Sequence, residues 1–282
     1  MLQKKINKYC FTFFILFHIG LSQDHFPASK IPLSAFRENR DFSPDLIASH
    51  INQLVFVDKK NHAIGIYSND SLRIVGGYGS SEYSFMDPVD VVIDNLDIMI
   101  LDESAGRVSK FDLNLNFVQL YNLKSNYPIY SKLFDIDSRR NIYFYSPEDD
   151  ILYRRNNSTQ KSVKFIDYNL NSTSYCVSDI FINTVDEIGV LFDCVGELHT
   201  YSRSGRLHRK YKTDLKKPVK IFFLNDDWAV INSNADIEFL NGTVSSLSID
   251  KEVLVDAYLD QNRLLILTKT NIYIFDSSII SK

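Results

Sequence analysis

The chain has 282 residues, of which 45% are apolar and 23% charged, with only 10 glycines and 7 prolines. This composition excludes a disordered or fibrous protein and is sufficient for a substantial buried core. The formal net charge of −4 excludes a general nucleic-acid-binding protein, because neutralising phosphates requires clustered cations.

The first 22 residues differ in character from the rest. Three lysines in the first eight positions precede an apolar run from Cys10 to Leu21, and Gly20 and Ser22 are small. This pattern predicts a signal peptide over residues 1–22 that is cleaved after Ser22. The run is shorter than the ~20 residues that span a bilayer. We therefore expect a secreted or periplasmic protein with no transmembrane anchor in the mature chain.

Strand-like segments recur along the remainder. Three of them, Pro88–Asp94, Asp97–Asp102 and Arg107–Asp112, end in Asp, and the first two are rich in Ile and Val or Leu. The same pattern occurs 44 residues earlier, where Pro44, Leu54, Asp58, Ile64 and Tyr67 take the places of Pro88, Ile98, Asp102, Val108 and Phe111. A repeat of this length indicates a repeat architecture.

Two series of apolar residues count the units. The second strand of each unit begins near Leu54, Ile98, Ile142, Ile188, Trp228 and Leu264. The third strand gives Ile64, Val108, Leu152, Leu198, Ile237 and Ile272. Both series predict six units of short strands.

Some inner segments, such as Ile98–Leu101 and Ile221–Leu224, are apolar at every position or nearly so. An antiparallel sheet with one solvated face would alternate, whereas a sheet enclosed between two neighbours would not. The sequence thus predicts an all-β, six-bladed β-propeller of four-stranded antiparallel blades over residues 44–282. The last unit lacks a fourth strand, and we expect the N-terminal segment 23–43 to supply it through Ile31–Arg37.

The second unit resembles an NHL repeat. Gly76–Gly79, Tyr83–Pro88, Val91–Asp94, Asp102 and Arg107 follow that pattern, in which Asp closes the second strand and Arg opens the third. In later units Ser146, Phe192 and Asn232 replace the Asp. The resemblance implies an NHL-like six-bladed propeller of the secreted or periplasmic bacterial type, a fold group that also includes amidating lyases and lactonases.

The start of each innermost strand in a propeller faces the central channel. About eight residues before the second-strand positions stand Leu46, Asp90, Asp135, Asp179, Lys220 and Asp256. The five charged residues of this set are our channel-lining candidates: Asp90, Asp135, Asp179, Lys220 and Asp256. Such a ring could hold a hard cation such as calcium or attract a cationic ligand, or its carboxylates could be solvated or paired with Lys220. We predict no cofactor, and calcium is the cation that such a ring could bind.

Catalytic signals are absent from the sequence pattern. The related lyases bind metal through histidines, but His25, His50, His62, His199 and His208 share no channel position. No Gly-x-Ser-x-Gly motif accompanies the many serines. We therefore identify no catalytic residue.

The mature chain keeps Cys176 and Cys194. If Ile182 pairs with Ile188 across a turn at 184–186, the same antiparallel register places the two cysteines opposite each other. A disulfide is expected, with two buried free thiols as the alternative.

A basic cluster falls in the outer part of the fourth unit and the link to the fifth: Arg203, Arg206, His208, Arg209, Lys210, Lys212, Lys216 and Lys217. It could bind an anionic partner, or it could protect an exposed edge strand from pairing with other chains.

The function hypothesis is an exported, non-catalytic monomer that recognises a protein, peptide or carbohydrate partner through its loops. The alternative is a metal-dependent hydrolase or lyase centred in the channel on Asp90, Asp179 and Asp256.

Overall fold

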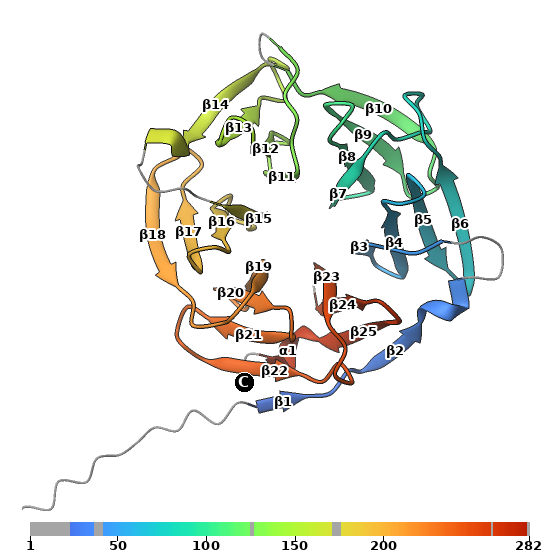
Figure 1. The fold of residues 1–282 in the computed structure, drawn as a ribbon, viewed down its shortest axis with the longest axis vertical. Coiled ribbons are helices and arrows are strands. Elements are labelled where there is room, and N and C mark those ends of the chain that lie inside the picture. Colours follow the sequence, from blue (N-terminus) through green and yellow to red (C-terminus); the bar gives the residue numbers. More distant parts are fainter. Residues whose placement is uncertain (1–22, 37–41, 125–126, 171–175, 261, 281–282) are drawn as a thin grey trace, which may run out of the picture.

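A computed structural model describes residues 23–36, 42–124, 127–170, 176–260 and 262–280. Six small sheets, built from these residues, surround a central channel like the blades of a propeller (Figure 1). This arrangement confirms the predicted all-β, six-bladed fold. The predicted signal peptide lies outside the described residues.

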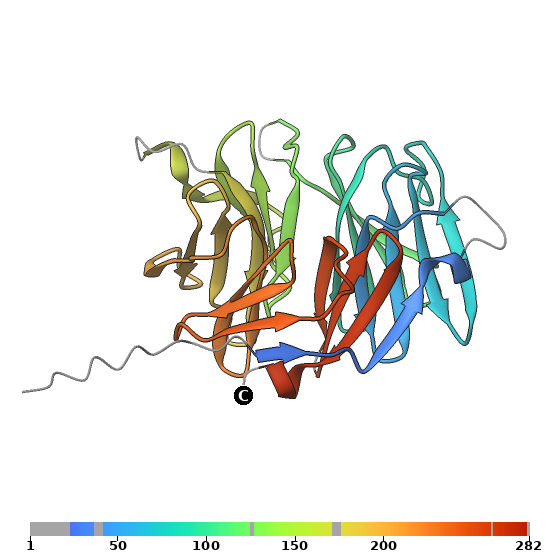
Figure 2. The ribbon, with the colours of Figure 1, turned by 60° about the horizontal axis from the view of Figure 1, so that its bottom comes forward.

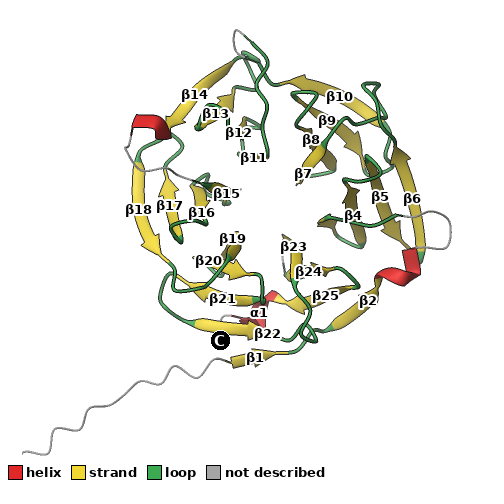
Figure 3. Ribbon diagram, in the orientation of Figure 1, coloured by secondary structure: helices red, strands yellow, loops and turns green. Residues whose placement is uncertain are grey.

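Helical structure in the described segments is restricted to η1 (Leu33–Phe36), η2 (Tyr168–Leu170) and α1 (Ser277–Ile280) (Figure 3). None of these has the length or apolar character needed to cross a membrane.

Within each blade the strands run from the channel outward, and most follow chain order. The first blade contains β3 (Leu46–His50), β4 (Gln53–Asp58), β5 (Ala63–Ser68) and β6 (Ser71–Gly76). The second contains β7 (Pro88–Asp94), β8 (Asp97–Asp102), β9 (Arg107–Asp112) and β10 (Phe117–Asn122). The third contains β11 (Leu133–Ile136), β12 (Ile142–Ser146), β13 (Ile151–Arg155) and β14 (Ser162–Asp167).

The remaining blades follow the same order. The fourth contains β15 (Val177–Ile182), β16 (Ile188–Phe192), β17 (Glu197–Tyr201) and β18 (Leu207–Lys212). The fifth contains β19 (Pro218–Leu224), β20 (Asp227–Asn232), β21 (Asp236–Phe239) and β22 (Val244–Leu247), and the sixth contains β23 (Leu254–Asp260), β24 (Arg263–Thr268) and β25 (Asn271–Asp276). Both apolar series found in the sequence therefore fall on the second and third strands of all six blades.

The core lies between blades. Second strands such as β4 and β8 are buried along nearly their whole length, whereas the outer strand β18 is almost entirely exposed. Each hydrophobic cluster of the described residues joins two neighbouring blades: Val55 and Ile64 of the first blade, for example, lie in one cluster with Ile98 and Phe111 of the second. Each blade is therefore buried on both faces only if both neighbours are present, which explains the uninterrupted apolar strands.

An N-terminal strand closes the ring, as predicted. Strand β2 (Ser29–Pro32) pairs antiparallel with β25 and forms the outer strand of the sixth blade. Strand β2 shares only Ile31 and Pro32 with the expected segment Ile31–Arg37. The strand ends at Pro32, and the chain turns into η1, which buries Leu33 and Phe36. Arg37 lies outside the described residues.

A second N-terminal strand was not predicted. Strand β1 (Gln23–His25) pairs parallel with β22 and adds a fifth strand to the fifth blade (Figures 1 and 2). The N-terminal segment therefore contacts two blades, the fifth through β1 and the sixth through β2.

The NHL-like residues of the second unit hold the connection 77–87 in place. Asp102, which is fully buried, accepts hydrogen bonds from the backbone N–H groups of Met86 and Asp87 at 3.0 and 2.8 Å. The guanidinium of Arg107 lies 3.5 Å from the Asp102 carboxylate and donates to the carbonyl oxygens of Ser80, Ser81 and Ser84 at 2.9, 3.2 and 2.7 Å. The motif thus serves to fix a loop.

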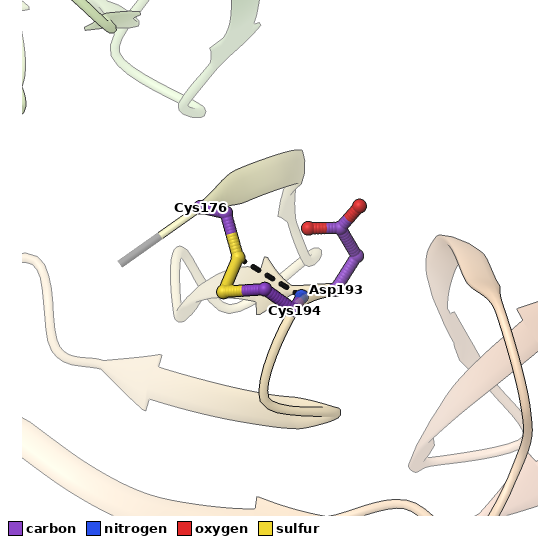
Figure 4. Close-up of side chains that lie close together, drawn as sticks. All are labelled: Cys176, Asp193 and Cys194. Carbon is purple, nitrogen blue, oxygen red and sulfur yellow. Dashed lines mark hydrogen bonds between the residues drawn. A yellow bond between two sulfur atoms is a disulfide. The ribbon is translucent and has the colours of Figure 1, made fainter. Parts of the chain in front are cut away.

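The predicted disulfide joins Cys176 to Cys194, with Cα atoms 5.9 Å apart (Figure 4). That separation lies in the usual range for a disulfide. The backbone N–H of Cys194 also donates to the sulfur of Cys176 at 2.9 Å.

The register behind this prediction is only partly right. Ile182 pairs with Ile188 as expected, but a β-bulge between Val177 and Asp179 shifts the pairing by one residue. Val177 therefore lies opposite Phe192, and the two cysteines are not directly opposed. The bond still forms because a shift of one residue keeps the sulfur atoms within reach.

Phe36 of η1 packs the closing segment against the first blade: it is 3% exposed, and its ring lies against those of Phe56 and Tyr67 at centroid distances of 5.2 and 4.7 Å. We expect Phe36→Ala to lower the free energy of unfolding by about 3–5 kcal/mol, because it opens a cavity between the first blade and the closing segment. Chemical denaturation measures this. Phe26→Ala is the matched control, since Phe26 is 72% exposed, and should change stability by less than about 0.5 kcal/mol. Equal stability of the two variants would contradict the role of η1 in closure.

Candidate functional site in the central channel

Four of the five predicted channel residues lie at one level of the channel. In four blades the innermost strand has a β-bulge immediately before the charged residue, and the residues that follow these bulges are Asp90, Asp179, Lys220 and Asp256. Each pairs with the fourth residue of the apolar stretch in the second strand, namely Leu101, Leu191, Ile231 and Leu267. In the first and third blades, which have no such bulge, Leu46 and Leu133 occupy this level.

Asp135 lies one side-chain step further along the channel. It pairs with Tyr143 rather than Tyr145, so it is displaced by two residues from Leu133 on the same face of β11. At its level the neighbouring inner strands carry apolar or aromatic residues. These are Val92, Phe181, Phe222 and Tyr258.

The carboxylates join neighbouring blades at four of the six blade junctions. Each accepts a hydrogen bond from a backbone N–H on the innermost strand of the following blade: Asp90 from Phe134 at 3.0 Å, Asp135 from Ile182 at 2.6 Å, Asp179 from Ile221 at 2.8 Å and Asp256 from Ile47 at 2.8 Å. The last of these bonds crosses the closure of the ring. Because first-strand N–H groups at the channel wall have no strand partner on that side, the carboxylates satisfy donors that would otherwise be buried without acceptors.

Lys220 bridges two of these carboxylates. Its ammonium lies 3.5 Å from Asp179 and 3.3 Å from Asp256, which belong to the blades on either side. Burial opposes the charge on Lys220, but the surrounding carboxylates outweigh burial and raise its pKa above the ordinary value. Neither Asp90 nor Asp135 has a cation within 4.0 Å among the residues described.

Burial disfavours ionisation of the acidic groups. It raises the pKa of Asp90 to about 6 and that of Asp179 to about 7, although Lys220 acts in the opposite direction on both. For Asp135 burial raises the pKa to about 8; its two backbone hydrogen bonds lower it, and the charges of Asp90 and Asp179 raise it further. The channel therefore contains carboxyl groups that gain or lose protons near neutral pH.

The charged ring separates two cavities. One, of about 250 Å³, lies toward the turns between first and second strands and is lined by the innermost strands of the second to sixth blades. The other, of about 410 Å³, opens toward the connections between blades and is lined in part by Lys59, Glu103 and Lys132. Asp90 and Lys220 contribute to the walls of both.

The sequence pattern missed the walls of the first cavity. Val92, Phe181, Phe222 and Tyr258 all line it and are aliphatic or aromatic. Each stands two residues after a ring-level channel position, at a place where strand alternation also directs a side chain into the channel. The repeat pattern points to one channel position per strand, and the two-residue alternation of a β-strand is the signal that identifies these further residues.

The channel carboxylates do not converge as metal ligands usually do. Among the described residues, the one group of three acidic, histidine or cysteine side chains with ligand atoms within 4.8 Å of one another is Cys176, Asp193 and Cys194 (Figure 4). Its two sulfur atoms are joined in the disulfide and are not thiolates. The described histidines line neither channel cavity.

The predicted basic cluster is divided in the structure. Arg203 forms an ion pair with Asp186, and His208 lies 3.0 Å from Glu187. Arg206 is exposed in the turn before β18. Arg209 and Lys210 are exposed on β18 itself, where consecutive side chains point to opposite faces.

No protein-family model matches the chain, and no curated protein sequence matches it. Among solved structures it is similar to a streptogramin B lyase, with a TM-score of 0.65 and 11% identity over 87% of this chain and 96% of the lyase. Virginiamycin B lyase from Staphylococcus aureus gives a TM-score of 0.62 and 11% identity over 88% of this chain and 98% of the lyase. The extracellular domain of a putative one-component system from B. thetaiotaomicron gives 0.59 and 9%, over 89% of this chain and 42% of that one.

At these identities the likeness establishes the six-bladed fold and assigns no activity. The NHL-type resemblance therefore holds for the architecture, while membership of the repeat family stays a prediction.

The inter-blade ties lead to a stability prediction. Asp256→Ala leaves the N–H of Ile47 without its acceptor and removes one of the two carboxylates beside Lys220, so we expect the free energy of unfolding to fall by about 3–5 kcal/mol. Urea denaturation measures the loss. Asp24→Ala, at an exposed position on β1, serves as control and should remain within about 0.5 kcal/mol of the parent protein. A loss below about 1 kcal/mol for Asp256→Ala would show that the tie does not hold the blades together.

The raised pKa of Asp135 leads to a pH dependence. In the unfolded chain its carboxyl has a pKa of about 3.9, whereas in the folded protein the pKa is about 8. Between these values the unfolded state binds fewer protons, so Asp135 makes the folded protein less stable as the pH rises. Asp135→Asn cannot titrate, and its stability relative to the parent should increase by a few kcal/mol from pH 5 to pH 8. A difference that stays constant over this range, measured by denaturation at each pH, would refute the shift.

Proposed function

We propose that this protein is an exported, non-catalytic propeller that binds an extended peptide or protein segment on the face formed by the connections between blades. The observation that carries this proposal is a set of exposed tyrosines on two inter-blade connections, the first of which is held in place by Arg107 and Asp102. Tyr78 and Tyr83 are 73% and 45% exposed on the connection 77–87. Tyr127 and Tyr130, 56% and 40% exposed, lie on the connection between the second and third blades.

Tyrosine suits such a surface because it combines a large apolar ring with a hydroxyl group that can form hydrogen bonds. The ring of Tyr78 already lies edge-on to His62, with centroids 5.1 Å apart. Tyr83 accepts a hydrogen bond from the N–H of Phe117 at 3.2 Å. Because Phe117 begins β10 at the far end of the blade, the Tyr83 ring lies along the flank of the blade, and Tyr78 is the tyrosine of this connection that lies on the binding face. These contacts restrain the two tyrosines while a large part of each remains exposed.

The connection is also rigid before any partner binds. Three carbonyl groups of residues 80–84 accept hydrogen bonds from Arg107, and Asp102 binds the backbone at its end. A preorganised loop loses less conformational entropy on binding, so more of the contact energy contributes to affinity.

Charges beside these connections favour a peptide over a neutral sugar. The 410 Å³ cavity opens on the same face, because Lys59 and Glu103 follow the ends of β4 and β8 and Lys132 precedes β11. A groove with both signs of charge complements a peptide, which carries amide dipoles and charged side chains of either sign.

Export is supported by the disulfide and by the predicted signal peptide. Disulfides persist mainly in oxidising compartments such as the periplasm and the extracellular space. The alternative of a hydrolase or lyase with a channel metal has less support, because one oxygen of each channel carboxylate is already bonded to the N–H of the next blade.

The test is a selection of random peptides on the immobilised protein, followed by affinity measurement for the selected peptides. We expect Tyr78→Ala combined with Tyr127→Ala to weaken binding at least tenfold, because both rings leave the surface. Val163→Ala is the control, since Val163 is 46% exposed on the outer strand β14, away from the connections.

Three outcomes would overturn the proposal. Selected peptides could bind equally well to the double tyrosine variant, the selection could give no specific peptide, or a glycan array could show saturable binding where peptides show none.

A further inference from the structure

We propose that the 250 Å³ channel cavity is a binding site for a small organic cation, an ammonium group on an apolar body, with Asp135 as its ion-pair partner and Phe181, Phe222 and Tyr258 as its walls. This site lies on the opposite side of the charged ring from the face proposed for peptide binding, and it does not depend on that proposal.

Size restricts the ligand. Pockets for drug-sized molecules have volumes of about 300–1,000 Å³, and this cavity is slightly smaller. Its lining combines a majority of aliphatic and aromatic side chains with a few charged groups, which is the usual composition of a small-molecule site.

The charged side chains that line the cavity determine which sign of charge the ligand carries. Asp90, Asp94, Asp135 and Asp179 line the cavity together with a single lysine, Lys220. Asp94, at the end of β7, forms an ion pair with Arg140 at 3.3 Å. Lys220 is already held between Asp179 and Asp256, at 3.5 and 3.3 Å. The remaining carboxylates, Asp90 and Asp135, therefore favour a cation and repel an anion.

The position of Asp135 distinguishes it from the other carboxylates. It departs from the common level of the ring and stands among Val92, Phe181, Phe222 and Tyr258, where the other blades have no charge. One carboxylate oxygen of Asp135 accepts a hydrogen bond from the N–H of Ile182, and the other accepts one from the N–H of Ile136. Each oxygen therefore uses one of its two lone pairs. A carboxylate oxygen accepts more than one hydrogen bond, so an ammonium group can still bind.

An organic cation fits better than a metal ion. A hard cation such as calcium needs six to eight oxygen ligands around one point. The channel carboxylates, among the residues described, do not bring their oxygens within 4.8 Å of one another as a set of three. An ammonium ion needs one carboxylate and gains from aromatic faces, which attract cations through the ring quadrupole.

Proton uptake should couple to this binding. Burial keeps the pKa of Asp135 at about 8, and the charges of Asp90 and Asp179 raise it further. The same cavity is lined by Asp94, which is paired with Arg140, by Lys220 and by Tyr258 of β23. A bound cation stabilises the carboxylate form. The affinity should therefore increase as the pH rises from 6 to 8, and the protein should release protons on binding at pH 7.

The probe is benzylamine, which has one ammonium group and one aromatic ring, measured by calorimetric titration of the full mature chain. We expect saturable binding to the parent protein and a loss of at least tenfold in affinity for Asp135→Asn. This variant keeps an oxygen for the N–H of Ile182, and a thermal melt verifies that it is folded. A second variant, Val92→Phe, fills the cavity without altering any carboxylate and should also abolish binding.

Controls separate the site from general attraction between charges. Asp24→Asn removes a carboxylate from the exposed strand β1 and should leave the affinity unchanged. Benzyl alcohol, which has the same shape without the charge, should bind at least tenfold more weakly than benzylamine. The inference is wrong if benzylamine does not saturate the parent protein, if folded Asp135→Asn binds it with unchanged affinity, or if benzyl alcohol binds as tightly.

Discussion

Closure of the ring is the constraint on which the rest of the structure depends. Each blade buries both faces of its inner strands against neighbours, so the first and sixth blades have complete cores only when they meet. The chain achieves this by pairing β2 with β25 and by inserting Leu33 and Phe36 into the cluster between these two blades. Closure also removes the open blade faces that an incomplete ring would expose.

The channel carboxylates belong to the same constraint. Closing six twisted sheets around an axis brings their innermost strands together, with backbone N–H groups that no strand can pair. Asp90, Asp135, Asp179 and Asp256 bind these groups across blade boundaries. The residues that look most like a catalytic cluster in the sequence thus have a structural task in the folded protein. Asp135 combines that task with a position in the aromatic-walled cavity.

The two faces of the propeller differ in how they can take part in recognition. On the face of the inter-blade connections, Arg107 and Asp102 hold a loop that exposes tyrosine rings. Toward the opposite face, the channel contains a cavity with mainly apolar walls, in which Asp135 is displaced from the level of the charged ring. The ring of charges at Asp90 and Lys220 lies between them, so a ligand on one side need not contact a ligand on the other.

The sequence by itself determined the number of blades, the order of the strands and the closure by an N-terminal strand, because burial on both faces imposes an apolar pattern that repeats with every blade. It also identified the two cysteines of the disulfide. It did not show the β-bulges before Asp90, Asp179, Lys220 and Asp256, the displacement of Asp135, or strand β1. Those features depend on register and on contacts between blades, and a single residue of register shift leaves the composition of a strand unchanged while it alters which side chains meet. Only the tertiary structure decided which carboxylates bind N–H groups of the next blade and which one faces the aromatic cavity.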